Sequence, residues 1–203
     1  MRLEGKLLGF RYGREPWLFR HLDLSVCAGE IVGLTGPSGS GKTTLARILA
    51  GYCTQIEGEV AIDGYPPGDS GYHPVQLVFQ HPERAINPRW RIHRVLAEGG
   101  GTTAPALLHA LGIAESWMRR WPGELSGGEL QRVCVARALG ERTRYLIADE
   151  MTAMLDPITQ AQIWHSVLDI ARQRQIGILL ISHDSPLMRR LCDRTVQIGG
   201  NGR

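Results

Sequence analysis

The sequence predicts an α/β fold that is built on a mostly parallel β-sheet. From Leu125 onward, short apolar segments typical of buried strands alternate with longer segments that have helical spacing. A glycine-rich loop at 36–43 stands between such a strand and a helix, and the apolar strand at 145–148 ends in two carboxylates. Strands that alternate with helices form parallel sheets covered on both faces, so we expect that architecture here.

The chain opens with two strands, expected over 3–10 and 18–26, which a turn at Tyr12-Gly13 connects. In the second strand, apolar residues at 22, 24 and 26 alternate with polar ones, as in a strand with one buried face. We predict an antiparallel β subdomain in this N-terminal part. Further strands are expected at 29–34, 59–62, 75–79, 145–148, 177–181 and 195–198, and core helices at 44–50, 127–139, 158–174 and 186–192.

Composition changes at His81, where prolines, arginines and short amphipathic segments replace the regular pattern. Helices are expected here at 90–98, 104–111 and 115–120. A chain of 203 residues suits a single domain. We therefore predict one domain over 1–203, with a core at 1–80 and 122–203 and a helical subdomain inserted at about 81–121.

The net charge is +3 and charges of both signs are interspersed, so nothing in the composition indicates a nucleic acid partner. The N-terminal residues lack the apolar core of a signal peptide, and no apolar run approaches the ~20 residues of a membrane span. Four cysteines without paired CxxC spacing favour reduced, mostly buried thiols. We expect a soluble cytoplasmic chain whose role at a membrane depends on a spanning partner.

Residues 36–43 match the phosphate-binding pattern GxxxxGK[ST]. The glycines let backbone N–H groups converge, and these groups and the positive end of the next helix bind phosphate oxygens. Lys42 adds a compact charge, and the Thr43 hydroxyl can bind Mg²⁺. We predict a P-loop NTPase core whose nucleotide contacts Gly36, Pro37, Ser38, Gly39, Ser40, Gly41, Lys42, Thr43 and Thr44. A glycine-rich turn without a ligand is the alternative.

The apolar strand at 145–148 leads directly into Asp149 and Glu150. Open α/β sheets hold ligands at the carboxyl ends of their strands, so we expect both carboxylates beside the phosphate loop. Asp149 suits a Mg²⁺ contact, direct or through water, and Glu150 suits a base that orients or deprotonates a water molecule. A strand that runs into an ordinary acidic turn is the alternative.

Ser126 and Glu129 have the spacing of a capping box at the start of a helix. Gly127 and Gly128 leave the N–H groups of this helix end exposed, and such an end binds anions. Because the phosphate loop already supplies one helix end, a second exposed end indicates a second phosphate, which another subunit can hold. An ordinary helix cap is the alternative.

The phosphate loop, the segment Leu-Ser-Gly-Gly-Glu-Leu-Gln-Arg at 125–132 and the Asp149-Glu150 pair resemble the nucleotide-binding subunit of ATP-binding cassette (ABC) transporters. The resemblance covers nearly the whole chain, and residues 125–129 are its most specific element. It implies that two cassettes pack head to tail over two ATP molecules. Each ATP then lies between the phosphate loop of one subunit and Ser126, Gly127, Gly128 and Glu129 of the other.

The same resemblance implies roles for four further residues. Tyr12 resembles the aromatic residue that stacks on adenine, and Gln80 resembles the glutamine that contacts Mg²⁺ and water and hinges the helical insert. His183 resembles the histidine that reaches the γ-phosphate, and Asp156 resembles the aspartate of the loop that crosses the dimer interface. A turn tyrosine and a surface or core histidine are the corresponding alternatives.

This chain departs from the family pattern in the loop after Glu150. Met151 and Ala153 stand where the family more often has proline and serine. Ala153 lacks a hydroxyl that could bond across the dimer interface, which concerns communication between the two sites rather than catalysis itself.

Residues 80–89 (Gln-His-Pro-Glu-Arg-Ala-Ile-Asn-Pro-Arg) are similar to the glutamine-loop segment of the dipeptide, oligopeptide and nickel importer branch. The resemblance implies an ATPase that uses ATP and Mg²⁺, pairs with a second ATPase subunit as a homodimer or heterodimer, and grips a transmembrane permease through its helical subdomain. An importer of this kind also has a substrate-binding protein, and the ATPase lies peripherally on the cytoplasmic face of the membrane. The alternative for this segment is that Asn87-Pro88 is only a turn.

Two other functions fit parts of the sequence. A soluble ABC-type ATPase that acts on DNA or ribosomes shares the signature at 125–129, but such proteins typically carry long coiled coils or two cassettes, and this chain shows neither. A P-loop kinase or GTPase leaves that signature unexplained. In the transporter hypothesis the catalytic residues are Glu150, His183 and Gln80, and the metal contacts are Thr43, Gln80 and Asp149.

Overall fold

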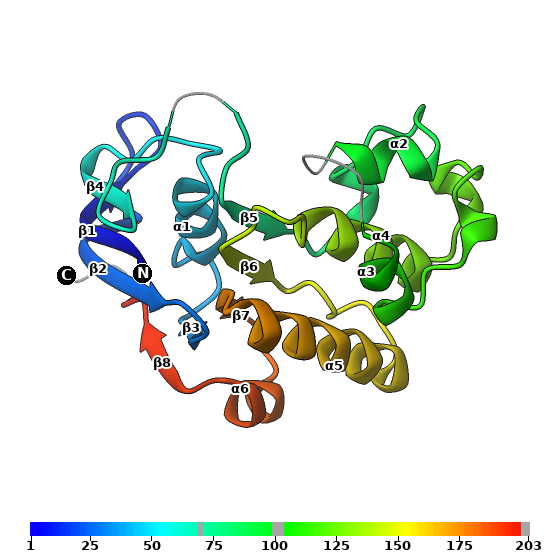
Figure 1. The fold of residues 1–203 in the computed structure, drawn as a ribbon. Coiled ribbons are helices and arrows are strands. Elements are labelled where there is room, and N and C mark those ends of the chain that lie inside the picture. The colour runs from blue at the N-terminus through cyan, green and yellow to red at the C-terminus, as the bar shows by residue number, and fades with distance from the viewer. Residues whose placement is uncertain (69–70, 99–103, 200–203) are drawn as a thin grey trace.

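The computed structural model describes residues 1–68, 71–98 and 104–199. In this part of the chain the strands form an antiparallel sheet with the order β2-β1-β4 and a parallel sheet with the order β5-β6-β7-β3-β8. Figure 1 shows the antiparallel sheet at one end of the molecule and the helical subdomain around α2 at the other. The predicted α/β class, with a parallel core and an antiparallel N-terminal part, is confirmed.

All but one of the predicted elements are observed within two residues of their expected bounds. The described strands are β1 (Arg2–Phe10), β2 (Phe19–Cys27), β3 (Ile31–Thr35), β4 (Glu57–Ile62), β5 (Val75–Val78), β6 (Tyr145–Asp149), β7 (Gly177–Ile181) and β8 (Arg194–Gln197). The described α-helices are α1 (Lys42–Leu49), α2 (Ile92–Ala97), α3 (Pro105–Ala110), α4 (Gly127–Ala138), α5 (Pro157–Arg174) and α6 (Ser185–Leu191).

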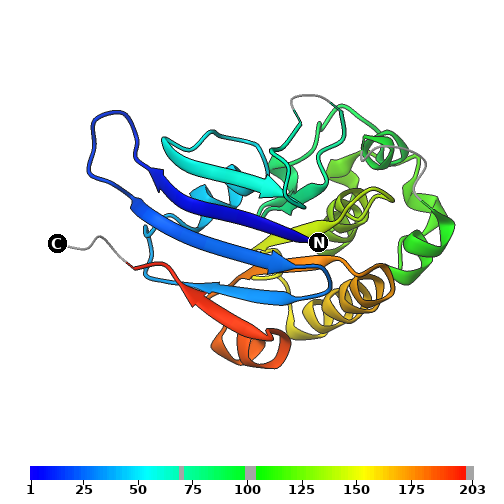
Figure 2. The same cartoon turned by 60° about the vertical axis from the view of Figure 1, so that its left-hand side comes forward.

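The antiparallel sheet packs on the helix that follows the phosphate loop. Leu3 in β1 lies opposite both Val26 in β2 and Ile62 in β4, and all three side chains are buried. They share a hydrophobic cluster with Leu45 and Leu49 of α1. Figure 2 shows the three strands side by side. This sheet therefore fixes α1, and with it the end of the phosphate loop.

Successive residues of β6 contribute to opposite sides of the parallel sheet. Tyr145 and Ile147 belong to the hydrophobic cluster that includes α1, whereas Leu146 and Ala148 belong to the cluster that includes α4 and α5. Helices on both faces keep the whole strand buried, which explains its continuous apolar sequence. Parallel pairing of β7 with both β6 and β3 brings the carboxyl ends of these strands to one edge.

Among the described residues between β5 and α4 are α2, α3 and the short 3₁₀ turns η1 (Pro82–Arg84), η2 (Glu115–Trp117) and η3 (Pro122–Glu124), of which η3 follows the predicted end of the helical subdomain. The predicted α-helix at 115–120 was wrong, since its first three residues form a 3₁₀ turn and the next three are turn and bend. The carbonyl groups of Met118 and Arg120 instead accept hydrogen bonds from the backbone N–H groups of His93 and Ile92 at the start of α2. Residues 99–103 of the predicted subdomain lie outside the described residues.

The cysteines are free thiols, as expected, but the prediction that most are buried was wrong. Among the four, only Cys134 is buried, and burial raises the pKa of its thiol to about 11. Cys27 is exposed at the end of β2, and Cys53 and Cys192 are partly exposed. Within the described ranges, the helices are all too short or too polar to cross a membrane.

Candidate nucleotide site

The phosphate loop joins the carboxyl end of β3 to the start of α1, as the sequence predicted. Gly41 has a φ of +93°, in the left-handed region that favours glycine. A Cβ atom at this position would lie 2.8 Å from side-chain atoms of Leu18 and Phe19. The loop conformation therefore requires glycine here, because β2 packs directly against it.

The ammonium group of Lys42 lies inside the phosphate loop. Its Nζ atom donates hydrogen bonds to the carbonyl oxygens of Gly36, at 2.9 Å, and Pro37, at 3.0 Å. Only 8% of the residue is exposed, so the positive charge is directed into the loop rather than into solvent. A buried ammonium beside a helix N-terminus is suited to an anionic ligand.

A cleft of about 320 Å³ opens beside this loop. Its lining combines the phosphate loop with the strand ends and the turn between β1 and β2, and the residues are Tyr12, Leu18, Ser38, Gly39, Gly41, Lys42, Thr43, Thr44, Glu150, Ile181 and His183. The structure thus brings predicted site residues from four separate segments into one cleft. Leu18 and Ile181 were not predicted, because an isolated apolar residue carries no sequence signal for a ligand.

Tyr12 stands at the rim of the cleft. Its hydroxyl lies 3.0 Å from Oγ1 of Thr44, and its ring packs edge-to-face on Phe10 with the ring centroids 5.0 Å apart. About half of the side chain remains exposed, at 51%. The ring is therefore held near the phosphate loop with area available for stacking.

Asp149 ends β6, directly before the cleft residue Glu150, and only 6% of it is exposed. Burial raises the pKa of this carboxyl group, a hydrogen bond from Thr43 opposes that shift, and the nearby charge of Glu150 adds to it. No cluster of three or more His, Cys, Asp or Glu side chains arranged for a metal occurs among the described residues. A hydroxyl and one carboxylate fit Mg²⁺ when phosphate oxygens supply further ligands.

Glu150 and His183 meet across the cleft. Their Oε1 and Nε2 atoms lie 3.3 Å apart, and the residues follow the neighbouring strands β6 and β7. Glu150 has a φ of +50°, which is unusual for a residue with a side chain. Its backbone N–H donates to the carbonyl oxygen of Ile181 at 3.0 Å, which ties the turn after β6 to β7.

Gln80 does not line this cleft. It follows β5, which pairs with β6, and the carbonyl oxygen of the preceding Phe79 accepts a hydrogen bond from Gln131 of α4 at 3.4 Å. Gln80 therefore lies at the junction between the sheet and the helical subdomain.

The signature residues and Asp156 form a second location, outside the cleft. The capping box is present, with the Ser126 N–H 2.7 Å from Oε2 of Glu129 and the Glu129 N–H 3.3 Å from Oγ of Ser126. Asp156 caps α5 by accepting from the N–H groups of Ile158 and Thr159, and hydrogen bonding lowers its pKa. A Cβ at Gly128 would lie 3.2 Å from Thr159, so the two helix ends are neighbours.

The sequence over residues 19–153 matches the family model described as ABC transporter. The chain belongs to the ABC transporter family. It is 35% identical to the nickel import ATP-binding protein NikE of Rhodospirillum rubrum, over 91% of this chain and 74% of that protein. It is also 35% identical to a Brucella abortus protein provisionally named a peptide import ATP-binding protein, over 85% of this chain but only 58% of that protein.

The fold matches a bacterial ABC transporter cassette solved as a dimer, with a TM-score of 0.80 over 97% of this chain and 94% of that chain. At 24% identity this likeness shows the fold alone. The predicted family, the P-loop NTPase fold and the ATPase class of this ABC-family chain are confirmed.

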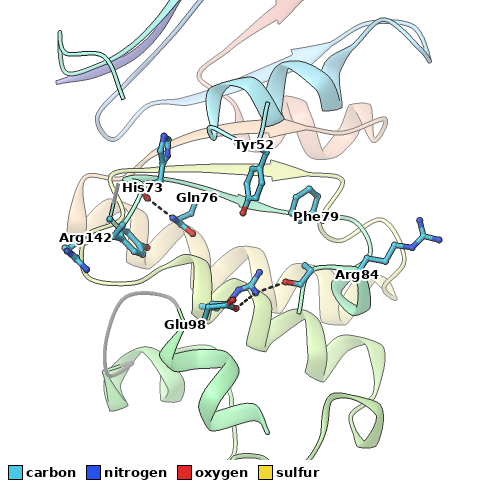
Figure 3. Close-up of a pocket in the computed structure, with 11 residues that line it drawn as sticks. Tyr52, His73, Gln76, Phe79, Arg84, Glu98 and Arg142 are labelled. Carbon is cyan, nitrogen blue, oxygen red and sulfur yellow. Dashed lines mark hydrogen bonds and ion pairs between the residues drawn. The ribbon is translucent and has the colours of Figure 1, made fainter. Parts of the chain in front are cut away.

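This ABC-family chain has a larger hollow of about 630 Å³ between the sheet and the helical subdomain (Figure 3). Its floor includes Tyr52 and Phe79, whose rings meet edge-to-face with centroids 5.8 Å apart. On the subdomain side, Nη1 of Arg137 donates to Glu98 at 3.0 Å and to the carbonyl of Ala85 at 2.7 Å. These residues share no sequence motif, since they come from distant segments that meet only in the folded chain.

Proposed function

We propose that this chain is the ATPase subunit of an importer for nickel, metal chelates or peptides, with the residue roles predicted from its sequence. The observation that carries the proposal is the cleft itself. It places the ammonium of Lys42, the carboxylate of Glu150 and the imidazole of His183 around one space beside the phosphate loop. The similarity to nickel and peptide import ATP-binding proteins supports the class of cargo.

In this proposal the loop N–H groups and Lys42 bind the nucleotide phosphates, and Tyr12 stacks on the base. Lys42 already makes two hydrogen bonds to loop carbonyls, so its charge is oriented before a ligand arrives. Thr43 and Asp149 would hold Mg²⁺, with Gln80 as a further contact. When bound, that ion supplies positive charge that neutralises phosphate oxygens.

Glu150 acts on the attacking water. The water oxygen forms a bond to the γ-phosphorus, the bond from that phosphorus to the β–γ bridging oxygen breaks, and ADP leaves with the bonding electron pair. Glu150 orients the water and accepts its proton, while His183, 3.3 Å from the carboxylate, holds that carboxylate and contacts the γ-phosphate. Because the transferring group needs little covalent assistance, positioning and charge account for most of the catalysis.

The signature location completes the site from a second ATPase subunit, either a copy or a relative of this chain. Ser126 and Gly127 are exposed at a capped helix end, and neither lines the cleft of their own subunit. Asp156 lies at the neighbouring end of α5. A related fold was solved as a dimer, which supports pairing of two subunits. In this proposal the pair is arranged head to tail, so that these residues meet the partner's nucleotide.

The hollow of Figure 3 is the proposed contact for a transmembrane permease. It combines exposed aromatic area with Arg84 and Arg142, which make no ion pair in the described part of the chain. Such a surface fits a helix end that presents apolar and acidic side chains. This contact would hold the ATPase peripherally at the cytoplasmic face of the membrane, with a substrate-binding protein on the other side.

A co-expression experiment tests this function. The chain is expressed with the permease and binding protein that neighbour its gene, and the complex is placed in vesicles. We expect ATP-dependent uptake of nickel or of short peptides, and ATP hydrolysis that rises when cargo and binding protein are added. ATP hydrolysis that responds to DNA or ribosomes, with no permease retained on purification, would contradict the proposal.

A further inference from the structure

The loop between Glu150 and Asp156 is fastened to α5 through one buried hydroxyl group. Oγ1 of Thr152 lies 2.9 Å from Nε2 of Gln160 and 3.1 Å from Nε1 of Trp164, and both nitrogens donate to it. Thr152 and Trp164 are each 3% exposed. Gln160 and Trp164 are four residues apart on α5, so they present their donors from the same face of that helix.

Glu150 depends on such a restraint, because its backbone has the left-handed φ of +50°. Two backbone hydrogen bonds fix this turn, from the Glu150 N–H to Ile181 and from the Ala153 N–H back to the Glu150 carbonyl, both at 3.0 Å. The first connects the turn to β7, and the second closes the turn on itself. Neither connects the turn to α5, and Thr152 supplies that connection.

Met151 makes the connection to α5 more important. A proline at this position would fix its own φ, as in the more common family pattern, but methionine leaves φ free. The side chain of Met151 is only 2% exposed, and its N–H donates no hydrogen bond to any described residue. The packing of Met151 and the hydrogen bonds to the Thr152 hydroxyl therefore hold the backbone in place of the proline ring.

The loop has space to move if the hydroxyl is released. A cavity of about 200 Å³ lies beside it, and its lining includes Glu150, Thr152, Trp164 and His183. Movement of the loop into this cavity would displace the carboxylate of Glu150, which lines both the cavity and the nucleotide cleft.

We propose that Gln160 and Trp164 are positioning residues that hold the Glu150 carboxylate in place through Thr152. The inference rests on the proposed catalytic role of Glu150. Neither residue lines the nucleotide cleft, so each acts on turnover without touching the nucleotide. Loss of either donor frees the loop and lowers kcat, while the phosphate loop, which belongs to other elements, keeps its affinity.

Trp164→Phe and Gln160→Met test this proposal, since each removes one donor and keeps most of the side-chain volume. We expect kcat for ATP hydrolysis to fall about tenfold in each, because small displacements of catalytic groups are costly. The KM for ATP should stay within about twofold of the wild-type value, as expected for an interaction made only in the transition state. Trp117→Phe and Gln173→Met are the matched controls, since neither side chain makes a hydrogen bond in the described residues, and both should retain wild-type kcat.

Rescue separates positioning from a merely structural role. Met151→Pro, introduced with Trp164→Phe, should restore kcat, because proline reinstates the missing backbone restraint. If that variant does not fold, Thr152→Ser and Thr152→Val test the same hydrogen bonds. Serine keeps the hydroxyl acceptor and should keep the wild-type kcat, whereas valine lacks it and should lower kcat. The inference is overturned if Trp164→Phe and Gln160→Met lower the melting temperature but leave kcat unchanged. It fails separately from the proposed function, which Glu150→Gln tests on its own.

Discussion

Oε1 of Glu150 lies 3.3 Å from Nε2 of His183, and the two residues follow adjacent parallel strands. The side chains are 24% and 57% exposed, so water screens their attraction and the pair adds little to stability. The contribution of the pair is geometric, since each side chain limits the rotamers of the other at the edge of the sheet where the phosphate loop begins. Both groups therefore face the cleft with their orientation already set.

Glu150→Gln should bind ATP normally but hydrolyse it about 100- to 10,000-fold more slowly, which is the usual contribution of a general base. The amide has the same shape as the carboxylate but cannot accept the proton of water. Single-turnover hydrolysis and nucleotide binding by equilibrium titration measure the two effects. The variant should also accumulate as a closed dimer with ATP, seen by size-exclusion chromatography. Glu141→Gln changes another glutamate that is exposed and unpaired in the described chain, and it should behave as wild type.

Wild-type turnover in Glu150→Gln, with the protein correctly folded, would remove Glu150 from the catalytic role. Asp149 would then be the remaining carboxylate at this end of β6.

Lys42→Ala should weaken ATP binding about 10- to 100-fold, because a hydrogen bond to a charged group contributes roughly 1.5–3 kcal/mol. The loop carbonyls of Gly36 and Pro37 would also lose their donor, so the loop itself becomes less ordered. Fluorescent nucleotide titration measures the loss. Lys6→Ala is a matched control, since Lys6 is the other lysine of the chain and its exposed side chain stands on β1, away from the phosphate loop. Equal ATP affinity in Lys42→Ala and Lys6→Ala would contradict the proposed role of Lys42 in binding the nucleotide phosphates.

Asp149→Asn should raise the melting temperature of the nucleotide-free protein at pH 7 while it abolishes Mg²⁺-dependent hydrolysis. Burial raises the pKa of Asp149 in the folded chain, so the folded chain binds more protons than the unfolded chain between the two pKa values. The contribution of this group to stability is therefore lost as pH rises through that window. The asparagine side chain carries no charge to desolvate. The increase in melting temperature of Asp149→Asn over the wild type should become smaller as the pH is lowered toward the ordinary pKa of aspartate.

Asp156→Ala should change the melting temperature in the direction opposite to that of Asp149→Asn. Hydrogen bonds from Thr159 and Ile158 lower the pKa of Asp156, so its stabilising effect is present above the ordinary pKa and disappears as pH falls through the folded value. Its removal should lower the melting temperature at pH 7. Equal shifts of both variants in the same direction would be inconsistent with these environments.

The parallel core was predictable because β6 and β7 are short, almost continuous apolar segments. Every residue in both strands is buried, as such segments indicate. It also located the capping box of α4, since a cap depends on residues within one turn. Local patterns of this kind need no knowledge of the tertiary structure. The helix expected at 115–120 failed for the opposite reason, because its last carbonyls bond to α2, about 25 residues away in sequence.

In the candidate site, too, local sequence patterns were predictable and long-range contacts were not. Motif spacing identified Lys42, Asp149 and Glu150, but not the roles of Thr152 and Trp164, which meet only when α5 packs beside the loop. The resemblance supplied His183, for which spacing alone gave no signal. Residues that support a site through long-range packing leave little trace in a single sequence.

Arg84→Glu should reduce retention of the permease at least about tenfold, because reversal of a charge at an interface adds repulsion to the lost attraction. Arg84 is exposed, lines the hollow and has no acidic partner in the described chain. ATP hydrolysis by the isolated subunit should not change, since the nucleotide cleft lies elsewhere. Pull-down with the permease measures the effect. Arg189→Glu makes the same charge change on α6, also at an exposed arginine, and should retain the permease.

Ser38→Cys combined with Ser126→Cys tests the head-to-tail arrangement. Ser38 lines the cleft and Ser126 lies outside it, so a head-to-tail pair brings Ser126 of one copy to Ser38 of the other. In a Glu150→Gln, Cys27→Ala background, which slows hydrolysis and removes an exposed thiol, a short bifunctional thiol reagent should cross-link two copies when ATP is present. Each single cysteine variant should give little dimer under the same conditions. Cross-linking that does not depend on ATP, or that occurs equally with one cysteine, would contradict the head-to-tail arrangement. It would mean that the N-terminal end of α4 does not close over the partner's nucleotide in a pair of this chain. The exposed end of α4 would then need another ligand to explain it.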